Sequence, residues 1–166
     1  PPRRSSDLPR GIGEGEPWQE AAYEQLPVGR GEKLLEGKRV AGLGLGPVVN
    51  RAVEAATRHR IDYGLGPAVY DMRFLKPLDP EIMEEAGKFD AIITVEDGCL
   101  KGGLNGAVSE YFAGKSAAVP VHRLGIDDRF VPHGKIGELQ KQLHLDAQSI
   151  KEIIEQELLL CDNSTK

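Results

Sequence analysis

The chain has 166 residues, which is enough for one domain with a sizeable hydrophobic core. Its formal net charge is −5 and its pI is about 5.4, so a nucleic-acid partner is not expected. No apolar run approaches the length of a membrane span and no signal-peptide pattern is visible, so we expect no membrane contact and a cytoplasmic location.

The first 25 residues differ in composition from the rest of the chain. They are rich in Pro, Gly, Arg, Ser and Glu, which predicts a linker or irregular segment. Residues 26–31 are too punctuated for a helix, so a short edge strand or a turn is expected there. The first strand of the main sheet is predicted over 39–45. A helix follows, with Pro47 at its start and its end near Arg60.

Short apolar runs then alternate with helical patterns to the end of the chain. Strands are predicted over 67–71, 90–96 and 119–124, and helices over 79–87, 103–113, 135–143 and 146–160. Asp79 and Asp146 are the expected N-caps of two of these helices. The alternation predicts an α/β fold of three layers, in which helices cover both faces of a mostly parallel sheet.

Three glycines, Gly42, Gly44 and Gly46, end the first strand in a pattern that suggests a dinucleotide-binding turn. The spacing differs from G-x-G-x-x-G, and Pro47 removes an amide that a phosphate cradle would use. A tight strand-to-helix turn is therefore favoured over nucleotide binding.

Two carboxylate pairs, Glu96-Asp97 and Asp127-Asp128, stand beside predicted strand ends, where ligands of parallel sheets usually bind. A divalent metal site is one interpretation, and helix capping with loop hydrogen bonding is the favoured one. Gly102-Gly103 precedes a helix and leaves two interpretations open: free amides for an anion, or close strand-to-helix packing.

The remaining polar residues indicate structural roles. Arg73 and Lys76 flank Phe74 in a loop, and an ion pair with Asp71 or Asp79 is expected to fix that loop. The histidines are scattered and pair with no nucleophile, so capping or packing is favoured for His59, His122, His133 and His144.

Three groups of residues follow one another at consistent spacing: Asp71-Met72-Arg73-Phe74 with Lys76-Pro77-Leu78-Asp79, Thr94-Val95-Glu96-Asp97-Gly98 with Gly102-Gly103, and Arg123-Leu124-Gly125-Ile126 with Asp128-Arg129-Phe130 and His133-Gly134. Together they resemble the C-terminal domain of the transketolase superfamily. Within it they are most similar to the 1-deoxy-D-xylulose-5-phosphate synthase family, over residues 8–155 or so.

The resemblance implies an enzyme that condenses pyruvate with glyceraldehyde 3-phosphate and releases carbon dioxide. It also implies thiamin diphosphate and Mg²⁺ as cofactors and a homodimer. Residues 1–25 would be the tail of the preceding pyrimidine-binding domain with a linker, residues 26–160 the C-terminal domain, and 161–166 a polar tail. The family's G-D-G motif with its distant asparagine does not occur here, so we expect no catalytic residue, cofactor site or metal site in this segment.

Arg10 is the one expected substrate-binding residue. Leu8-Pro9-Arg10-Gly11 resembles the family's P-R-G motif, whose arginine helps to hold the substrate phosphate, although Asp7-Leu8 replaces the usual Arg-Tyr. Two alternatives remain. One is another enzyme of the superfamily, a transketolase or the β-subunit of a 2-oxoacid dehydrogenase. The other is a free-standing, non-catalytic α/β interaction module.

Overall fold

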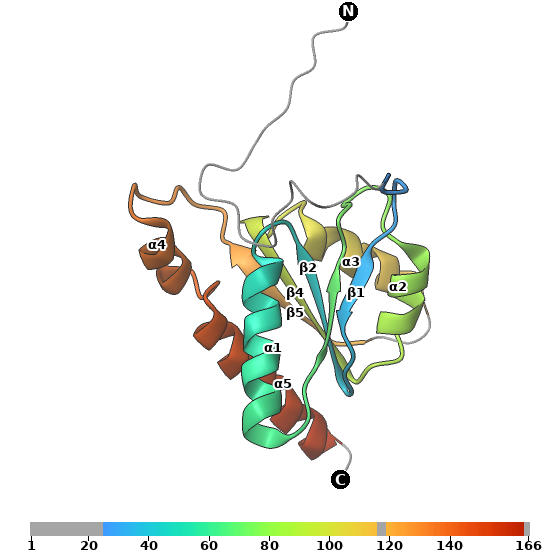
Figure 1. The fold of residues 1–166 in the computed structure, drawn as a ribbon. Coiled ribbons are helices and arrows are strands. Elements are labelled where there is room, and N and C mark those ends of the chain that lie inside the picture. The colour runs from blue at the N-terminus through green and yellow to red at the C-terminus, as the bar shows by residue number, and fades with distance from the viewer. Residues whose placement is uncertain (1–24, 116–118, 165–166) are drawn as a thin grey trace, which may run out of the picture.

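The structure is a computed structural model that describes residues 25–115 and 119–164. Within these residues the strands and helices alternate along most of the chain (Figure 1). The strands are β1 (Glu32–Leu35), β2 (Val40–Leu45), β3 (Ala68–Asp71), β4 (Ala91–Cys99) and β5 (Val121–Ile126). The helices are α1 (Val49–Tyr63), α2 (Pro80–Ala86), α3 (Leu104–Ala113), α4 (Ile136–Gln142) and α5 (Ala147–Ser164).

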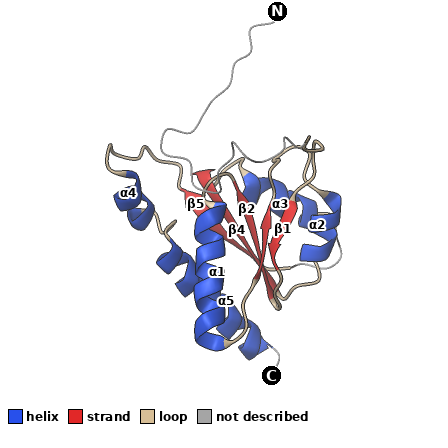
Figure 2. Cartoon of the chain, in the orientation of Figure 1, coloured by secondary structure: helices blue, strands red, loops and turns tan. Residues whose placement is uncertain are grey.

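The strands form one sheet in the order β1-β3-β2-β4-β5. β2 pairs in parallel with β3 and β4, and β4 pairs in parallel with β5, whereas β1 is an antiparallel edge strand on β3. Helices cover both faces of this sheet, with α1 and α5 on one face and α2 and α3 on the other (Figures 1 and 2). The predicted three-layer, mostly parallel α/β fold is confirmed.

Each face of the sheet has its own hydrophobic core. On one face, small residues of α1 let α5 approach the strands, and the cluster includes Ala52, Ala56, Val69, Ile93, Ile150 and Ile154. On the other face, α2 and α3 pack on the alternate strand positions, and the cluster includes Leu43, Tyr70, Met83, Ile92, Leu104 and Val108. The alternation of side chains along each strand divides the apolar residues between the two cores.

The glycine series at the end of β2 is a close-packed turn, as the sequence predicted. A Cβ on Gly44 would lie 2.2 Å from Cγ2 of Val49, in the first turn of α1. Gly46 has φ +79°, a conformation that side chains with a Cβ rarely adopt. The glycines therefore let the chain turn sharply and let α1 pack directly on its own strand.

Several boundaries differ from the expected ones. β4 continues to Cys99, because Leu100 N–H donates to the Ile126 carbonyl across a break in the β4–β5 register. Of the two expectations for residues 26–31, the turn is confirmed: the Arg30 amide donates to the Pro27 carbonyl, and the edge strand β1 begins after it at Glu32. α5 continues to Ser164, four residues beyond its predicted end. No Gly or Pro interrupts this stretch, so the helix is free to extend into polar residues.

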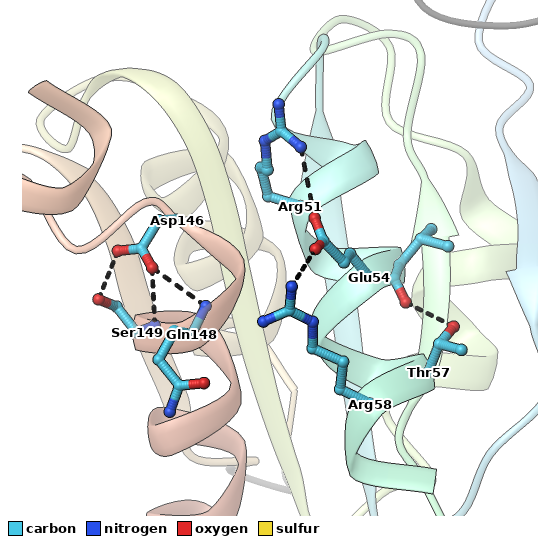
Figure 3. A network of polar contacts seen from close by, with 8 residues as sticks. Arg51, Glu54, Thr57, Arg58, Asp146, Gln148 and Ser149 are labelled. Atoms are coloured by element: carbon cyan, nitrogen blue, oxygen red, sulfur yellow. Dashed lines mark hydrogen bonds and ion pairs between the residues drawn. The ribbon is translucent and has the colours of Figure 1, made fainter. Parts of the chain in front are cut away.

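α1 and α5 lie side by side, and the ion pair of Lys151 with Asp62 joins them at 3.1 Å. Each helix also carries polar contacts of its own (Figure 3). On α1, Glu54 binds Arg51 at 3.3 Å and Arg58 at 2.5 Å. At the start of α5, the Asp146 carboxylate accepts hydrogen bonds from the amides of Gln148 and Ser149 and from the Ser149 hydroxyl. The predicted N-cap at Asp146 is confirmed.

The described helices include none that is both long and apolar enough to cross a bilayer.

Candidate functional site

Two buried carboxylates, Asp79 and Glu96, organise the loops that follow β3 and β4. Asp79 ends the loop that joins β3 to α2, and Glu96 lies in β4 itself, opposite the start of α3. Both side chains are almost completely buried. A buried carboxylate is costly unless hydrogen bonds satisfy it, so the partners of each show what it holds in place.

Asp79 joins three parts of the chain. Its Oδ1 accepts hydrogen bonds from the amides of Glu81 at 2.9 Å and Ile82 at 3.4 Å, which makes it the predicted N-cap of α2. Its Oδ2 accepts the Gly31 amide at 2.9 Å, and the Arg30 guanidinium lies 3.4 Å from Oδ1. We call Asp79 with Arg30 and Gly31 the Asp79 clamp.

The charge on Asp79 is stabilised within the clamp. Burial alone would raise the pKa of this carboxyl. The amides of Gly31, Glu81 and Ile82 and the charge of Arg30 outweigh burial and hold the pKa below its ordinary value. Asp79 is therefore ionised at neutral pH, as an acceptor of several hydrogen bonds should be.

Glycines let the segment before β1 lie directly against the β3–α2 loop. A Cβ on Gly29 would lie 2.6 Å from Cγ of Pro77, and a Cβ on Gly31 would lie 2.6 Å from the carbonyl oxygen of Asp71. The peptide bond between Lys76 and Pro77 is cis. Because of these close contacts, residues 29–31 lie against the loop, and the Asp79 carboxylate at its end binds the Gly31 amide.

An ion pair of Arg73 with Asp71 or Asp79 was predicted, and this prediction is wrong because Arg73 pairs with another residue. The Arg73 guanidinium pairs with Glu32 in β1, and only its backbone amide binds the Asp71 carboxylate. The carboxylate of Asp79 pairs instead with Arg30. The loop is fixed by ion pairs, as predicted, but both pairs reach across to the segment before and within β1.

Glu96 fills the N-terminus of α3. Its Oε2 accepts the Leu104 amide at 2.9 Å and its Oε1 accepts the Asn105 amide at 3.1 Å. A Cβ on Gly103 would lie 2.1 Å from Oε2. The anion expected as one interpretation of Gly102-Gly103 is therefore a carboxylate of the same chain, and the glycine provides the space for it.

Capping is confirmed for Glu96, and the metal interpretation of the carboxylate pairs gains no support. Among the residues that the structure describes, no group of three or more His, Cys, Asp or Glu side chains is placed to hold a metal ion. Asp128 pairs with Lys101 at 3.2 Å, and both side chains are exposed. An exposed pair of this kind contributes about 1 kcal/mol or less.

A shallow groove lies beside the end of β5, lined by Cys99, Ile126, Asp127, Asp128, Phe130 and Val131. Phe130 is fully exposed, so it contributes apolar surface without covering a core.

Two histidines have the structural roles that the sequence favours. His59 Nδ1 lies 2.7 Å from the Leu65 carbonyl oxygen at the end of α1. His122 Nδ1 lies 2.8 Å from Glu157 Oε1 and ties β5 to α5. Arg10, the expected phosphate-binding residue, lies outside the described residues.

Sequence reasoning missed Arg30, Gly31 and Glu32 as partners of the β3–α2 loop. Gly31 and Asp79 are 48 residues apart, so no local pattern links them. The one available signal was the glycine on each side of Arg30, which marks close backbone approach but does not identify what approaches.

The sequence of this chain is similar to those of known proteins. Residues 29–150 match the family described as transketolase, C-terminal domain. A 1-deoxy-D-xylulose-5-phosphate synthase of Bacteroides thetaiotaomicron is 42% identical over 158 residues, which are 94% of this chain and 24% of that protein. The synthase of Cytophaga hutchinsonii is 45% identical over 143 residues, which are 86% of this chain and 22% of that protein.

A solved structure described as "Split gene transketolase, inactive beta4 tetramer" has a similar fold. It matches with a TM-score of 0.72 and 31% identity, over 82% of this chain and 44% of that chain. The chain spans about a quarter of the length of the curated relatives that it matches.

Proposed function

The chain belongs to the transketolase C-terminal domain family, and we propose that it is the C-terminal part of a 1-deoxy-D-xylulose-5-phosphate synthase. The complete enzyme would be a transferase that condenses pyruvate with glyceraldehyde 3-phosphate and releases carbon dioxide. The cytoplasm is its expected location.

The observation that carries the proposal is the extent of the similarity. Identity of 42% continues over 94% of the chain, so it includes the residues before the matched domain as well as the domain itself. The 31% identity to the split-gene transketolase is lower and covers 82% of the chain. The similarity to the synthase is therefore higher in identity and covers more of this sequence than the similarity to the split-gene transketolase.

Thiamin diphosphate and Mg²⁺ are the proposed cofactors of the complete enzyme, and the described residues do not fit them. Glu96-Asp97-Gly98 is the nearest match to a diphosphate motif. Glu96 is already buried and satisfied by two amides of α3. We therefore place the cofactor site in other parts of the enzyme and assign this segment a structural role in assembly.

The domain boundaries follow from the same proposal. Residues 1–25 would end the pyrimidine-binding domain, residues 26–160 would form the C-terminal domain, and 161–166 would be a tail. Arg10 would then lie in the preceding domain's tail, where its guanidinium fork suits the phosphate of glyceraldehyde 3-phosphate. A homodimer is the proposed assembly.

A second candidate is the corresponding part of a transketolase. The fold agreement with the split-gene transketolase favours it, since a TM-score of 0.72 is reached at 31% identity.

A chimera tests the proposed function. In it, this chain replaces the matched C-terminal portion of the Bacteroides thetaiotaomicron synthase. The chimera should form product from pyruvate and glyceraldehyde 3-phosphate, while the isolated chain should neither form product nor bind thiamin diphosphate in a calorimetric titration with Mg²⁺. A folded but inactive chimera, or micromolar cofactor binding by the isolated chain, would contradict the proposal.

A further inference from the structure

The groove beside the end of β5 has a volume of about 370 Å³ and lies at the carboxyl ends of two parallel strands. It is lined by Cys99 of β4, Ile126 of β5 and residues 127–131, which follow β5. Ligands of open α/β sheets usually bind outside the carboxyl ends of the strands. The volume is near the lower end of the range for ligand sites, so a small molecule suits it. We call it the β5 groove.

Two opposite charges in the β5 groove have no ion-pair partner among residues 25–115 and 119–164: the Asp127 carboxylate and the Arg129 guanidinium. They do not pair with each other, although only one residue separates them. The backbone amide of Arg129 donates to the Asp127 carbonyl at 2.6 Å, so a tight turn fixes the backbone between the two side chains. Asp128 differs from both, because it pairs with Lys101.

Apolar side chains form the rest of the groove. Phe130 is fully exposed, and Ile126 and Val131 are partly exposed. Phe130 and Val131 belong to neither hydrophobic core, so their contacts are not needed to hold the sheet and helices together. The β5 groove therefore presents a negative group, a positive group and an apolar wall side by side.

We propose that the β5 groove binds a free α-amino acid with an apolar side chain. The carboxylate of the ligand accepts hydrogen bonds from the guanidinium of Arg129, whose planar fork matches a carboxylate. The ammonium group of the ligand donates to the Asp127 carboxylate. Its apolar side chain lies on Phe130 and Val131. This ligand differs from the substrates of the proposed synthase, and the inference does not depend on the proposed function.

Charge balance selects a ligand with both charges over a simple ion. An anion would pair with Arg129 but would leave Asp127 partly removed from water without a partner, and a cation would do the reverse. Removing an unpaired charge from water is costly. The Cα atoms of the two residues lie within about 7 Å of each other, because one residue separates them. An α-amino acid carries both of its charges on one carbon, which suits this short separation.

Three compounds and three variants test each charge separately. L-leucine has both charges, isocaproate is the same molecule without the ammonium group, and isoamylamine is the same molecule without the carboxylate. Asp127→Asn and Arg129→Gln each remove one charge of the groove. Asp128→Asn is the matched control, because Asp128 lines the same groove and already pairs with Lys101. The three substituted side chains are exposed, so the fold should be retained.

An NMR titration of the 166-residue chain measures binding through the backbone amide shifts of residues 126–131. L-leucine should bind with a Kd of about 1 mM or below. Isocaproate and isoamylamine should bind at least about fivefold more weakly, since each lacks one charge-assisted hydrogen bond.

The variants should divide the two analogues between them. Asp127→Asn should weaken L-leucine at least about fivefold and leave isocaproate unchanged, because isocaproate has no ammonium group. Arg129→Gln should weaken L-leucine by a similar factor and leave isoamylamine unchanged. Asp128→Asn should change the Kd of L-leucine by less than about twofold.

Several outcomes overturn the inference. The first is the absence of shifts at residues 126–131 at about ten times the expected Kd of L-leucine. Equal affinities for the three compounds, or an effect of Asp128→Asn as large as that of Asp127→Asn, would also reject it. Shifts of the same amides that depend on the concentration of the chain alone would assign the β5 groove to a second copy, which rejects the amino-acid site as well.

Discussion

The carboxylate of Glu96 and the bare backbone of Gly103 fit one another: a Cβ at Gly103 would lie 2.1 Å from Oε2 and 2.6 Å from the carboxyl carbon. The helix terminus that would otherwise attract an external anion is thus satisfied from within the chain. Hydrogen bonds within the chain therefore hold the β4–α3 connection in place.

Gly103→Ala should destabilise the domain by about 2–4 kcal/mol, because the methyl group displaces Glu96 and leaves a buried carboxylate with fewer donors. Gly106→Ala is the control in the same helix. A Cβ at Gly106 meets nothing within 4 Å, so this variant should gain about 0.5–1 kcal/mol from helix propensity. Urea unfolding measures both. Equal effects of the two substitutions would contradict the account of Glu96.

Gly44→Ala and Gly42→Ala should differ in their effect on stability, and only Gly44→Ala should destabilise the domain. A Cβ on Gly44 would lie 2.2 Å from Cγ2 of Val49, so Gly44→Ala should cost about 1–3 kcal/mol as α1 moves away from β2. A Cβ on Gly42 meets its nearest neighbour at an ordinary 3.4 Å, and this substitution should be neutral or stabilise by up to about 1 kcal/mol. Thermal unfolding of both variants measures these effects on stability. A loss of stability with Gly42→Ala as large as that with Gly44→Ala would disprove the tight-turn explanation.

Asp79→Asn should lower the free energy of unfolding at pH 7 by about 1–3 kcal/mol, since one buried amide loses its acceptor. The pKa of Asp79 is lower in the folded chain than its ordinary value of 3.8, so its contribution is complete above that value and is lost as the pH falls through the folded pKa. The difference between wild type and variant should therefore shrink as the pH falls below 3.8. Denaturant unfolding at several pH values checks this, and a pH-independent difference would contradict it.

The secondary structure was largely predictable because its signals are local. The Asp79 and Asp146 caps bind amides two and three residues away, so sequence spacing is enough to find them. Gly102-Gly103 predicted either an anion or close backbone packing at the start of α3. The spacing of the residues alone could not decide between the two. Glu96 reaches Leu104 only because the strand and helix fold back on each other.

The Asp79 clamp and the end of β4 could not be predicted from the sequence, because both depend on residues that lie far apart along the chain. Gly31 and Arg30 meet Asp79 across 48 and 49 residues, through the antiparallel pairing of β1 with β3. The extension of β4 to Cys99 depends on hydrogen bonding to Ile126 in β5. Such contacts are tertiary, and no propensity within one segment encodes them.

Arg10→Ala in the chimera should raise the Michaelis constant for glyceraldehyde 3-phosphate at least tenfold, or by about 1.4 kcal/mol or more, if Arg10 holds the substrate phosphate. The constant for pyruvate should hardly change, because pyruvate has no phosphate. Arg10→Lys should recover part of the loss, since lysine keeps the charge but not the bidentate fork. An equal effect on both substrates would assign Arg10 to structure instead.

The central claim is that this chain is the C-terminal part of a synthase rather than of a transketolase. Two chimeras test it most directly: one places the chain in the Bacteroides thetaiotaomicron synthase, and the other places it in the split-gene transketolase, each in the matched position. The transketolase host is assayed in its active form and not as the inactive beta4 tetramer. The measurement is kcat/KM of each chimera for its own reaction, relative to its unaltered host. We predict that the synthase chimera keeps at least a tenth of its host's kcat/KM for pyruvate and glyceraldehyde 3-phosphate, while the transketolase chimera keeps far less. The reverse order would contradict the assignment.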